Sequence, residues 1–240
     1  MYELILGDWR KFPIGGHTCI ITDPPYTEHV QSRLLAGKKK SDASDAYTRT
    51  VACDFDALDG YEDIKKLIDS TPKWSLFFCA LEQLGEYQSA ANDRWVRSGI
   101  YCKSRAMPQM SGDRPGNRCE GISIFHAPGK KQWNGGGTAA YWMANPENRK
   151  DTLHPTAKPL MLCMRLVQLF SNVGDVVLDP YAGTGTIGLA CKLLGRDYKG
   201  FEISTDYVKA AEERYANVMA EPQKYLTKYE AYKVSKGQNE

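Results

Sequence analysis

The residues best suited to chemistry form the tetrapeptide Asp23-Pro24-Pro25-Tyr26, which follows an apolar run at residues 18–22. That run predicts a short buried strand. Two consecutive prolines donate no backbone hydrogen bonds and fix φ at about −65°, so the chain leaves the strand in a stiff conformation. A carboxylate, free backbone carbonyls and an aromatic ring could together hold a flat heterocycle that carries an amino group. A strand-ending Pro-Pro turn with a capping Asp is the alternative interpretation.

A second candidate site is the segment 179–186, Asp-Pro-Tyr-Ala-Gly-Thr-Gly-Thr, which joins an apolar run to an apolar-periodic segment. The segment predicts a strand, a glycine-bearing turn and a helix, and the next strand ends in an acid, Glu202. This order of elements is typical of a nucleoside-cofactor site. The turn lacks the third glycine of the dinucleotide fingerprint and the Gly-Lys-Ser/Thr of a phosphate loop. Its threonines and helix N-terminus could hold a carboxylate instead. An ordinary βα turn is the alternative.

These segments need an α/β sheet that brings the carboxyl ends of its strands to one edge, where such sheets bind ligands. The apolar runs predict seven strands, at 2–6, 18–22, 74–80, 99–102, 122–126, 175–178 and 198–201. Helical spacing predicts helices at 61–69, 82–97, 160–170, 186 to about 194, and 205–218. The tail after Ala220 is either a docked helix or a frayed end.

Length and composition fit one domain over residues 1–240, with a net charge of only +2. Contacts with nucleic acid would therefore need local basic patches. Seven cysteines without a C-x-x-C pair favour reduced thiols in a cytoplasm over a zinc site or a disulfide framework, and no metal is expected. No apolar run approaches the length of a membrane span, so a soluble, cytoplasmic protein is expected. Four cysteines are expected to be small core residues: Cys19, Cys79, Cys163 and Cys191.

Three segments show no regular pattern. Residues 27–56 are polar, and a loop of that length is expected to be functional or mobile. Residues 107–119 are rich in Gly, Pro, Arg and Asn and are expected to form a loop. Residues 127–153 are the candidate for a small insertion that could recognise a target.

Three motifs carry a resemblance to a known family: Asp-Pro-Pro-Tyr at 23–26, His-Pro-Thr-x-Lys-Pro at 154–159 and Asp-Pro-x-x-Gly-x-Gly-Thr at 179–186. In this order they resemble the amino-group DNA methyltransferases that use S-adenosylmethionine, in the permuted beta arrangement. The resemblance extends from Asp8 to Glu202. It implies a doubly wound, mostly parallel, seven-stranded sheet of the Rossmann-like methyltransferase type with one antiparallel strand. In that sheet the strands that end at Asp23 and Asp179 are neighbours.

The resemblance also implies roles for single residues. Asp23 and the carbonyl of Pro24 would accept hydrogen bonds from the exocyclic amine of a base, Tyr26 would stack on that base, and Pro25 completes this catalytic motif. The cofactor would be bound by Asp8 at its adenine, by Glu202 at its ribose, and around its methionine part by Thr156, Lys158, Asp179, Ala182, Gly183, Thr184, Gly185 and Thr186.

The implied chemistry is a direct displacement at the sulfonium methyl group, governed by positioning and electrostatic preorganisation. A base inside a duplex would have to be flipped out to reach the site. His126 and His154 are expected to be structural, because this reaction makes no clear demand for a base near neutral pH. Candidate contacts to DNA phosphates are Lys38, Lys39, Lys40, Arg105, Arg114, Arg118, Lys130 and Lys131. The lysine triplet has a solvated surface run as its alternative interpretation.

Adenine N6 is the favoured target, because Asp is the commoner first residue of the motif in adenine enzymes; cytosine N4 is the runner-up. The rivals are an RNA methyltransferase, a non-catalytic nucleic-acid-binding subunit and a nucleotide-binding oxidoreductase. The motif order disfavours the RNA methyltransferase, and the intact Asp23 and Tyr26 disfavour the non-catalytic subunit. The missing third glycine disfavours the oxidoreductase. The recognition sequence, a homodimer and a restriction partner stay open.

Overall fold

The structure is a computed structural model that describes all residues except 28–57, 59, 106–111, 113–114, 148–156 and 236–240. Its elements in chain order are β1 (Tyr2–Leu6), η1 (Trp9–Lys11), β2 (Cys19–Thr22), α3 (Glu62–Ser70), β3 (Trp74–Cys79), η2 (Leu81–Gln83), α4 (Leu84–Ala90), β4 (Trp95–Lys103), β5 (Cys119–His126), β6 (Tyr141–Ala144), α5 (Leu160–Phe170), β7 (Val176–Asp179), α6 (Thr186–Leu193), β8 (Asp197–Glu202), α7 (Thr205–Ala220) and α8 (Pro222–Ser235).

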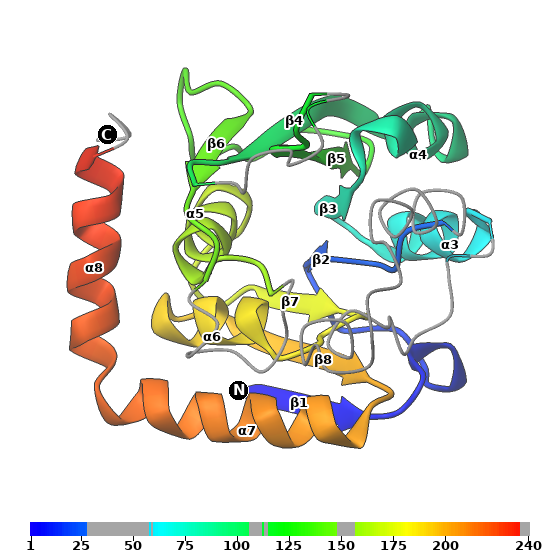
Figure 1. Ribbon diagram of the computed structural model, residues 1–240. Helices are drawn as coiled ribbons and strands as arrows, with labels where there is room; N and C mark the ends of the chain where they lie inside the picture. Colours follow the sequence, from blue (N-terminus) through cyan, green and yellow to red (C-terminus); the bar gives the residue numbers. More distant parts are fainter. Residues whose placement is uncertain (28–57, 59, 106–111, 113–114, 148–156, 236–240) are drawn as a thin grey trace.

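In the described residues the strands form one sheet in the order β1-β8-β7-β2-β3-β5-β4-β6 (Figure 1). All neighbouring pairs are parallel except those of β5, which runs antiparallel to β3 and β4. Near the centre of the sheet β2 pairs with β7, and Ile20 lies opposite Leu178. At one edge β1 pairs with β8, with Leu6 opposite Glu202. These pairings confirm the mostly parallel fold with one antiparallel strand, and they confirm the permuted order of its parts.

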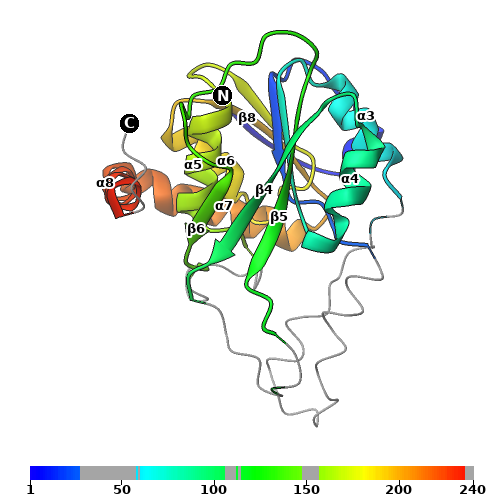
Figure 2. The same cartoon turned by 90° about the horizontal axis from the view of Figure 1, so that it is seen from above.

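Helices cover both faces of the sheet (Figure 2). Successive side chains of a strand point to opposite faces, so a strand buried on both sides is apolar throughout. In β2, Ile21 joins the core that packs under α5 and α6, whereas Ile20 joins the core under α3. In β3, Leu76 and Phe77 divide between the same two cores. This double burial explains why the central strands are the clearest signals in the sequence.

The predicted number of strands and one predicted helix are wrong. The sheet has an eighth strand, β6, inside the segment 127–153, where only Trp142 and Ala144 of its four residues are buried. A strand this short and only half buried leaves no clear alternation of apolar and polar residues in the sequence. The helix predicted at 82–97 ends at Ala90, and β4 begins at Trp95. The apolar residues of 95–97 belong to a strand that pairs with β5, and tertiary pairing outweighs local helical spacing here.

The cysteines of the described residues divide into two groups. Four are buried free thiols in the core, as predicted: Cys19, Cys79, Cys163 and Cys191. Cys102 and Cys119 lie opposite each other on β4 and β5 and form a disulfide, so the prediction of reduced thiols is wrong at this pair. The register of two strands creates the pairing, and cysteine spacing alone does not reveal it.

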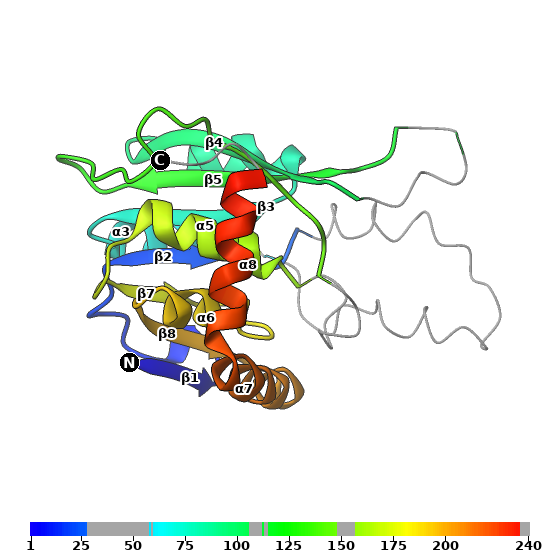
Figure 3. The ribbon, with the colours of Figure 1, turned by 90° about the vertical axis from the view of Figure 1, so that its left-hand side faces the viewer.

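The C-terminal segment is a docked helix, which decides between the two interpretations of the tail. In Figure 3, α8 crosses in front of α5 and α6, and it contacts both helices. Tyr229 Oη donates to Gln168 Oε1 over 2.5 Å, and Tyr232 Oη donates to the carbonyl of Met143 over 3.0 Å. Among the described helices, none has the length and apolar character needed to cross a bilayer.

Candidate active site

Four acidic residues gather where β1, β2, β7 and β8 end. These strands are parallel and point in one direction (Figure 3), so their carboxyl ends share one edge of the sheet. Asp23 directly follows β2, Asp179 ends β7, Glu202 ends β8, and Asp8 follows β1. Thr22 Oγ1 donates to Asp179 Oδ1 over 2.6 Å and ties the two central strand ends together. The fold therefore unites the two motifs that the sequence separates.

Within the described residues, Asp23 has one oxygen engaged and one without a hydrogen-bond partner. Lys158 Nζ donates to Asp23 Oδ2 over 2.6 Å. The other oxygen, Oδ1, is buried and accepts no hydrogen bond from the described part of the chain. Burial raises the pKa of Asp23, and the neighbouring ammonium of Lys158 offsets part of that rise. Asp23 is thus an oriented carboxylate whose second oxygen can accept from a ligand.

Lys158 is the buried cation of this site. Its Nζ lies 3.1 Å from Glu120 Oε2 and 6.0 Å from the centroid of the Tyr26 ring. Burial opposes its charge, but Asp23 and Glu120 outweigh this, and the pKa of Lys158 lies well above its usual value. The resemblance implied a contact with the cofactor carboxylate, whereas in this structure Lys158 contacts Asp23 of the 23–26 motif.

Glu120 and Lys103 extend this cluster, and no sequence motif predicts them. Glu120 Oε1 forms an ion pair of 2.7 Å with Lys103 Nζ. Burial opposes the charge of Glu120, yet Lys158 and Lys103 together lower the pKa of Glu120 to about 2. The sequence held one signal, an acid at the start of the apolar strand β5. An acid buried in such a strand needs a cationic partner.

The glycine turn after β7 has the open backbone that a ligand cradle needs. Gly183 and Gly185 adopt φ of 52° and 71°, which strains any residue with a Cβ. A Cβ at Gly183 would meet no atom within 4 Å, so the backbone there is accessible. Glu202 Oε2 accepts from the Gly183 amide over 2.8 Å, and Oε1 accepts from the Ser204 amide over 2.9 Å. Glu202 thereby fixes the turn, and its remaining lone pairs can accept from hydroxyls.

The other predicted cofactor residues occupy several environments. Asp179 is buried and accepts from Thr22 and, over 3.3 Å, from Tyr198 Oη; burial raises the pKa of Asp179 to about 7. Thr184 is buried, and Thr186 Oγ1 accepts from Arg214 Nη1 over 2.6 Å.

Two more of the predicted cofactor residues are held by local contacts. The Ala182 amide donates to the Phe201 carbonyl over 2.9 Å. Asp8 accepts from the Arg10 amide and side chain, and chiefly the side-chain bond lowers the pKa of Asp8.

The predicted DNA contacts lie at opposite ends of the sheet. Arg105 follows the end of β4 and Arg118 precedes β5, so both exposed side chains flank the edge that carries Asp23. Lys130 and Lys131 follow the end of β5, which is antiparallel, and they line a groove at the opposite edge. The remaining predicted site residues lie outside the described part of the chain: Lys38, Lys39, Lys40, Arg114 and Thr156.

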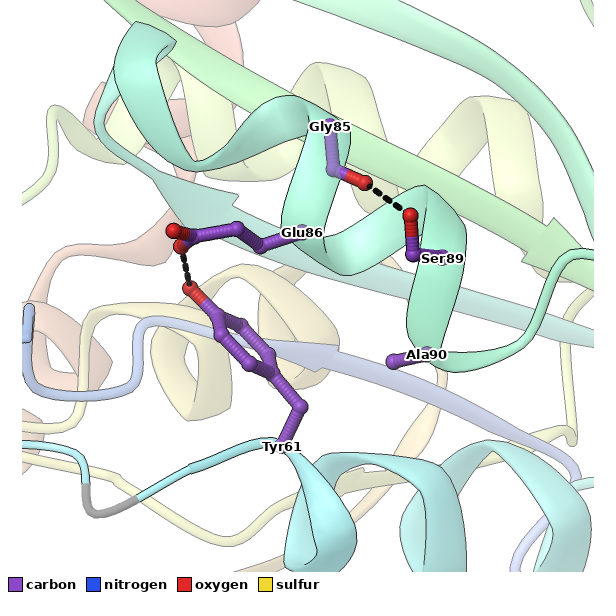
Figure 4. A pocket seen from close by; sticks show the side chains of 5 residues that line it. All are labelled: Tyr61, Gly85, Glu86, Ser89 and Ala90. Atoms are coloured by element: carbon purple, nitrogen blue, oxygen red, sulfur yellow. Dashed lines mark hydrogen bonds between the residues drawn. The ribbon is translucent and has the colours of Figure 1, made fainter.

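A further pocket lies between α3 and α4, where Tyr61 Oη donates to Glu86 Oε2 over 2.5 Å (Figure 4). Gly85, Ser89 and Ala90 complete its lining. No residue predicted to act on a cofactor, a base or DNA contributes to this pocket. We therefore place the site at the carboxyl edge of the central strands.

Two bacterial methyltransferases are similar to this chain in sequence. The chain is 28% identical to Type II methyltransferase M.HinfI of Haemophilus influenzae over 243 residues, covering 89% of this chain and 67% of that protein. It is 46% identical to Type II methyltransferase M.HpaI of Haemophilus parainfluenzae over 68 residues, covering 28% of this chain and 21% of that protein. The chain thus spans about a fifth of one relative and two thirds of the other.

Solved structures share the fold. The structure of an M1.HpyAVI–SAM complex has a TM-score of 0.66 and 22% identity, covering 89% of this chain and 98% of that chain. The PvuII DNA methyltransferase, described as cytosine-N4-specific, has a TM-score of 0.66 and 13% identity, covering 88% of this chain and 85% of that chain. At these identities the likeness shows the fold alone.

The model of the N6/N4 DNA methylase family matches residues 18–213, which include all three motifs and the strands from β2 to β8. The chain belongs to this family of DNA methylases, whose members use S-adenosylmethionine to methylate an amino group of adenine or cytosine.

Proposed function

We propose that this chain transfers the methyl group of S-adenosylmethionine to the N6 amine of an adenine flipped out of DNA. The observation that carries the proposal is the state of Asp23. One of its oxygens is held by Lys158, and its other oxygen is buried without a hydrogen-bond partner in the described residues. A buried acceptor without a donor is costly unless a ligand supplies one, and an exocyclic amine is such a donor.

The reaction needs a pyramidal nitrogen. The lone pair of an exocyclic amine is delocalised into the ring, which makes the amine a poor nucleophile. If Asp23 Oδ1 and the Pro24 carbonyl accept its two N–H groups, the lone pair turns toward the methyl donor. The stiff Pro24-Pro25 backbone fixes these acceptors before the base arrives, and such preorganisation favours the transition state. Tyr26 supports the base by stacking.

The residues at the glycine turn fit the cofactor. Glu202 lies at the end of β8, where it accepts from the Gly183 amide, and the accessible backbone of Gly183 leaves room for a ligand. When bound, S-adenosylmethionine supplies an activated methyl group. We assign Glu202 to the ribose hydroxyls, Asp8 to the adenine amine, and the turn at 182–186 to the methionine part, with Thr156 near its carboxylate. Lys158, which the resemblance also assigns to that carboxylate, is assigned instead to Asp23, whose Oδ2 it contacts.

The choice of adenine rests on the Asp that opens the 23–26 motif. Both adenine and cytosine present an amine beside a ring nitrogen, so two acceptors fit either base. Cytosine N4 is the alternative target. We propose that DNA approaches the carboxyl edge, where Arg105 and Arg118 are exposed. We propose that Lys38–Lys40 and Arg114 also contact the DNA phosphates. Lys130 and Lys131 lie at the opposite edge of the sheet, and we do not assign them to DNA.

The test is incubation of the protein with DNA of varied sequence and methyl-labelled S-adenosylmethionine, followed by nucleoside mass spectrometry. We expect labelled N6-methyladenine. If the only labelled product is N4-methylcytosine, the target base is cytosine rather than adenine, and the assignment of the site residues stands. DNA that gains no label from an enzyme that binds the cofactor would contradict the proposal.

A further inference from the structure

Four side chains of alternating charge form a row that ends at the catalytic acid. Lys158 Nζ lies 2.6 Å from Asp23 Oδ2 and 3.1 Å from Glu120 Oε2. The second oxygen of Glu120 lies 2.7 Å from Lys103 Nζ. Asp23 follows β2, Lys103 ends β4, Glu120 lies in β5, and Lys158 precedes α5. Four separate elements thus meet in one electrostatic row.

The inner members of the row are the most buried. Side-chain exposure is 9% for Lys158 and 14% for Glu120, against 28% for Asp23 and 33% for Lys103. A buried ammonium must be paired to keep its charge. Lysine also has a long flexible stem, so a single ion pair fixes its head group poorly. Glu120 gives Lys158 a second carboxylate partner, at 3.1 Å.

We propose that Glu120 is a positioning residue for methyl transfer: anchored by Lys103, it holds Lys158 against Oδ2 of Asp23 and so keeps Oδ1 directed at the target amine. This inference rests on the proposed function. Glu120 does not touch the substrate or the cofactor in this account, and it acts through Lys158. Its place in the site follows from the antiparallel β4–β5 pairing, which puts Tyr101 opposite Glu120 and brings Lys103 within reach of that carboxylate.

A purely structural role makes a different prediction. If Glu120 only stabilised the β4–β5 edge, its replacement would lower the melting temperature and leave the turnover of folded enzyme unchanged. A positioning role predicts a loss in kcat, because the acceptor oxygen would be misdirected in the transition state. The separation of kcat from cofactor affinity and thermal stability therefore decides between the two roles.

The main variant is Glu120→Gln, which keeps the shape and removes the charge. We expect kcat to fall by at least about tenfold, with the dissociation constant for S-adenosylmethionine changed by less than about twofold. The matched control is Glu230→Gln in α8, which breaks a 2.9 Å ion pair with Lys233 away from the site. The control is expected to turn over at the wild-type rate.

A double-mutant cycle tests the row itself. Lys103→Gln is expected to lower kcat by less than Glu120→Gln does, because Lys103 acts only through Glu120. Adding Lys103→Gln to Glu120→Gln should cause no further loss, since residues that act through one contact are not additive. Additive losses, or wild-type kcat in folded Glu120→Gln, would overturn the proposal. If Glu120→Gln does not fold, a wild-type kcat for Lys103→Gln would overturn it.

A crystal structure of Glu120→Gln separates this inference from the proposed function. We expect Lys158 Nζ to move beyond hydrogen-bond distance of Asp23 Oδ2. An unchanged contact would overturn the positioning role even if the wild-type enzyme methylates DNA. A wild-type enzyme that methylates no DNA would refute the proposed function, while the displaced lysine would still be observed.

Discussion

Lys158 Nζ lies 2.6 Å from Asp23 Oδ2, although the two residues are 135 positions apart in the chain. The contact joins the motif at 154–159 to the motif at 23–26. The consequence is an asymmetric carboxylate, with Oδ2 engaged and Oδ1 buried without a partner in the described residues.

Replacement of Glu202 by Ala should weaken S-adenosylmethionine binding by at least about tenfold, because charged hydrogen bonds contribute about 1.5–3 kcal/mol each. The loss has two parts: the acceptor for ribose hydroxyls, and the contacts that fix the Gly183 and Ser204 amides. Isothermal calorimetry measures the affinity. Glu213→Ala, at an exposed position of α7, is the control. An unchanged dissociation constant would remove Glu202 from the cofactor site.

Tyr26→Ala should weaken transfer through lost stacking of about 1–3 kcal/mol on the flipped base. Tyr26→Phe keeps the ring and should retain most of the activity. Steady-state kinetics with saturating cofactor measures the effect, and calorimetry checks that cofactor affinity is spared. If Tyr26→Phe lowers the rate of methyl transfer as much as Tyr26→Ala does, the hydroxyl matters more than the ring, and the stacking role is wrong.

Flipping predicts tighter binding to a duplex in which the target adenine is mispaired. Unpairing and unstacking cost a few kcal/mol, and a mismatch has already lost part of that stability. Fluorescence anisotropy with matched and mismatched duplexes of one sequence, in the presence of a non-reactive cofactor analogue, measures the difference. Equal affinities would argue for a single-stranded substrate or against flipping.

Asp179 should make stability depend on pH. Its pKa is raised by burial to about 7, so the folded state binds its proton more tightly than the unfolded chain does. The stability that this group contributes is full below about pH 4 and is lost as the pH rises through about 7.

Asp179→Asn removes that dependence. The melting temperature of the variant relative to wild type should therefore rise between about pH 5 and about pH 8. Asp93→Asn, at an exposed position after α4, is the control. Calorimetric melting curves at both pH values measure the difference, and an equal difference at the two values would contradict the assignment.

The sequence predicted the parts whose signal is local. Strands such as β3 are apolar throughout because both faces are buried, and both motifs lie at the strand ends where the sequence placed them. Contacts that depend on register were missed. The Cys102–Cys119 disulfide and the Lys103–Glu120 ion pair exist only because β4 and β5 pair in one particular alignment.

Strand direction explains another difference. Lys130 lies near Arg118 in the sequence, but β5 runs between them against its neighbours and carries the chain to the opposite edge of the sheet. The partner of Lys158 likewise depends on tertiary structure, since Lys158 precedes α5, and α5 contacts β2, the strand that Asp23 follows. Periodicity and motif spacing carry neither kind of information.

The most direct test of the central claim is methyl transfer by the wild type and by Asp23→Ala, with trideuteromethyl S-adenosylmethionine and adenine-containing duplex DNA. Digested DNA is analysed by nucleoside mass spectrometry, and cofactor affinity is measured on the same samples. The wild type should yield trideuterated N6-methyladenine, and Asp23→Ala should yield none while it still binds the cofactor. Full transfer by Asp23→Ala would contradict the account, because the amine would then need no carboxylate at this position.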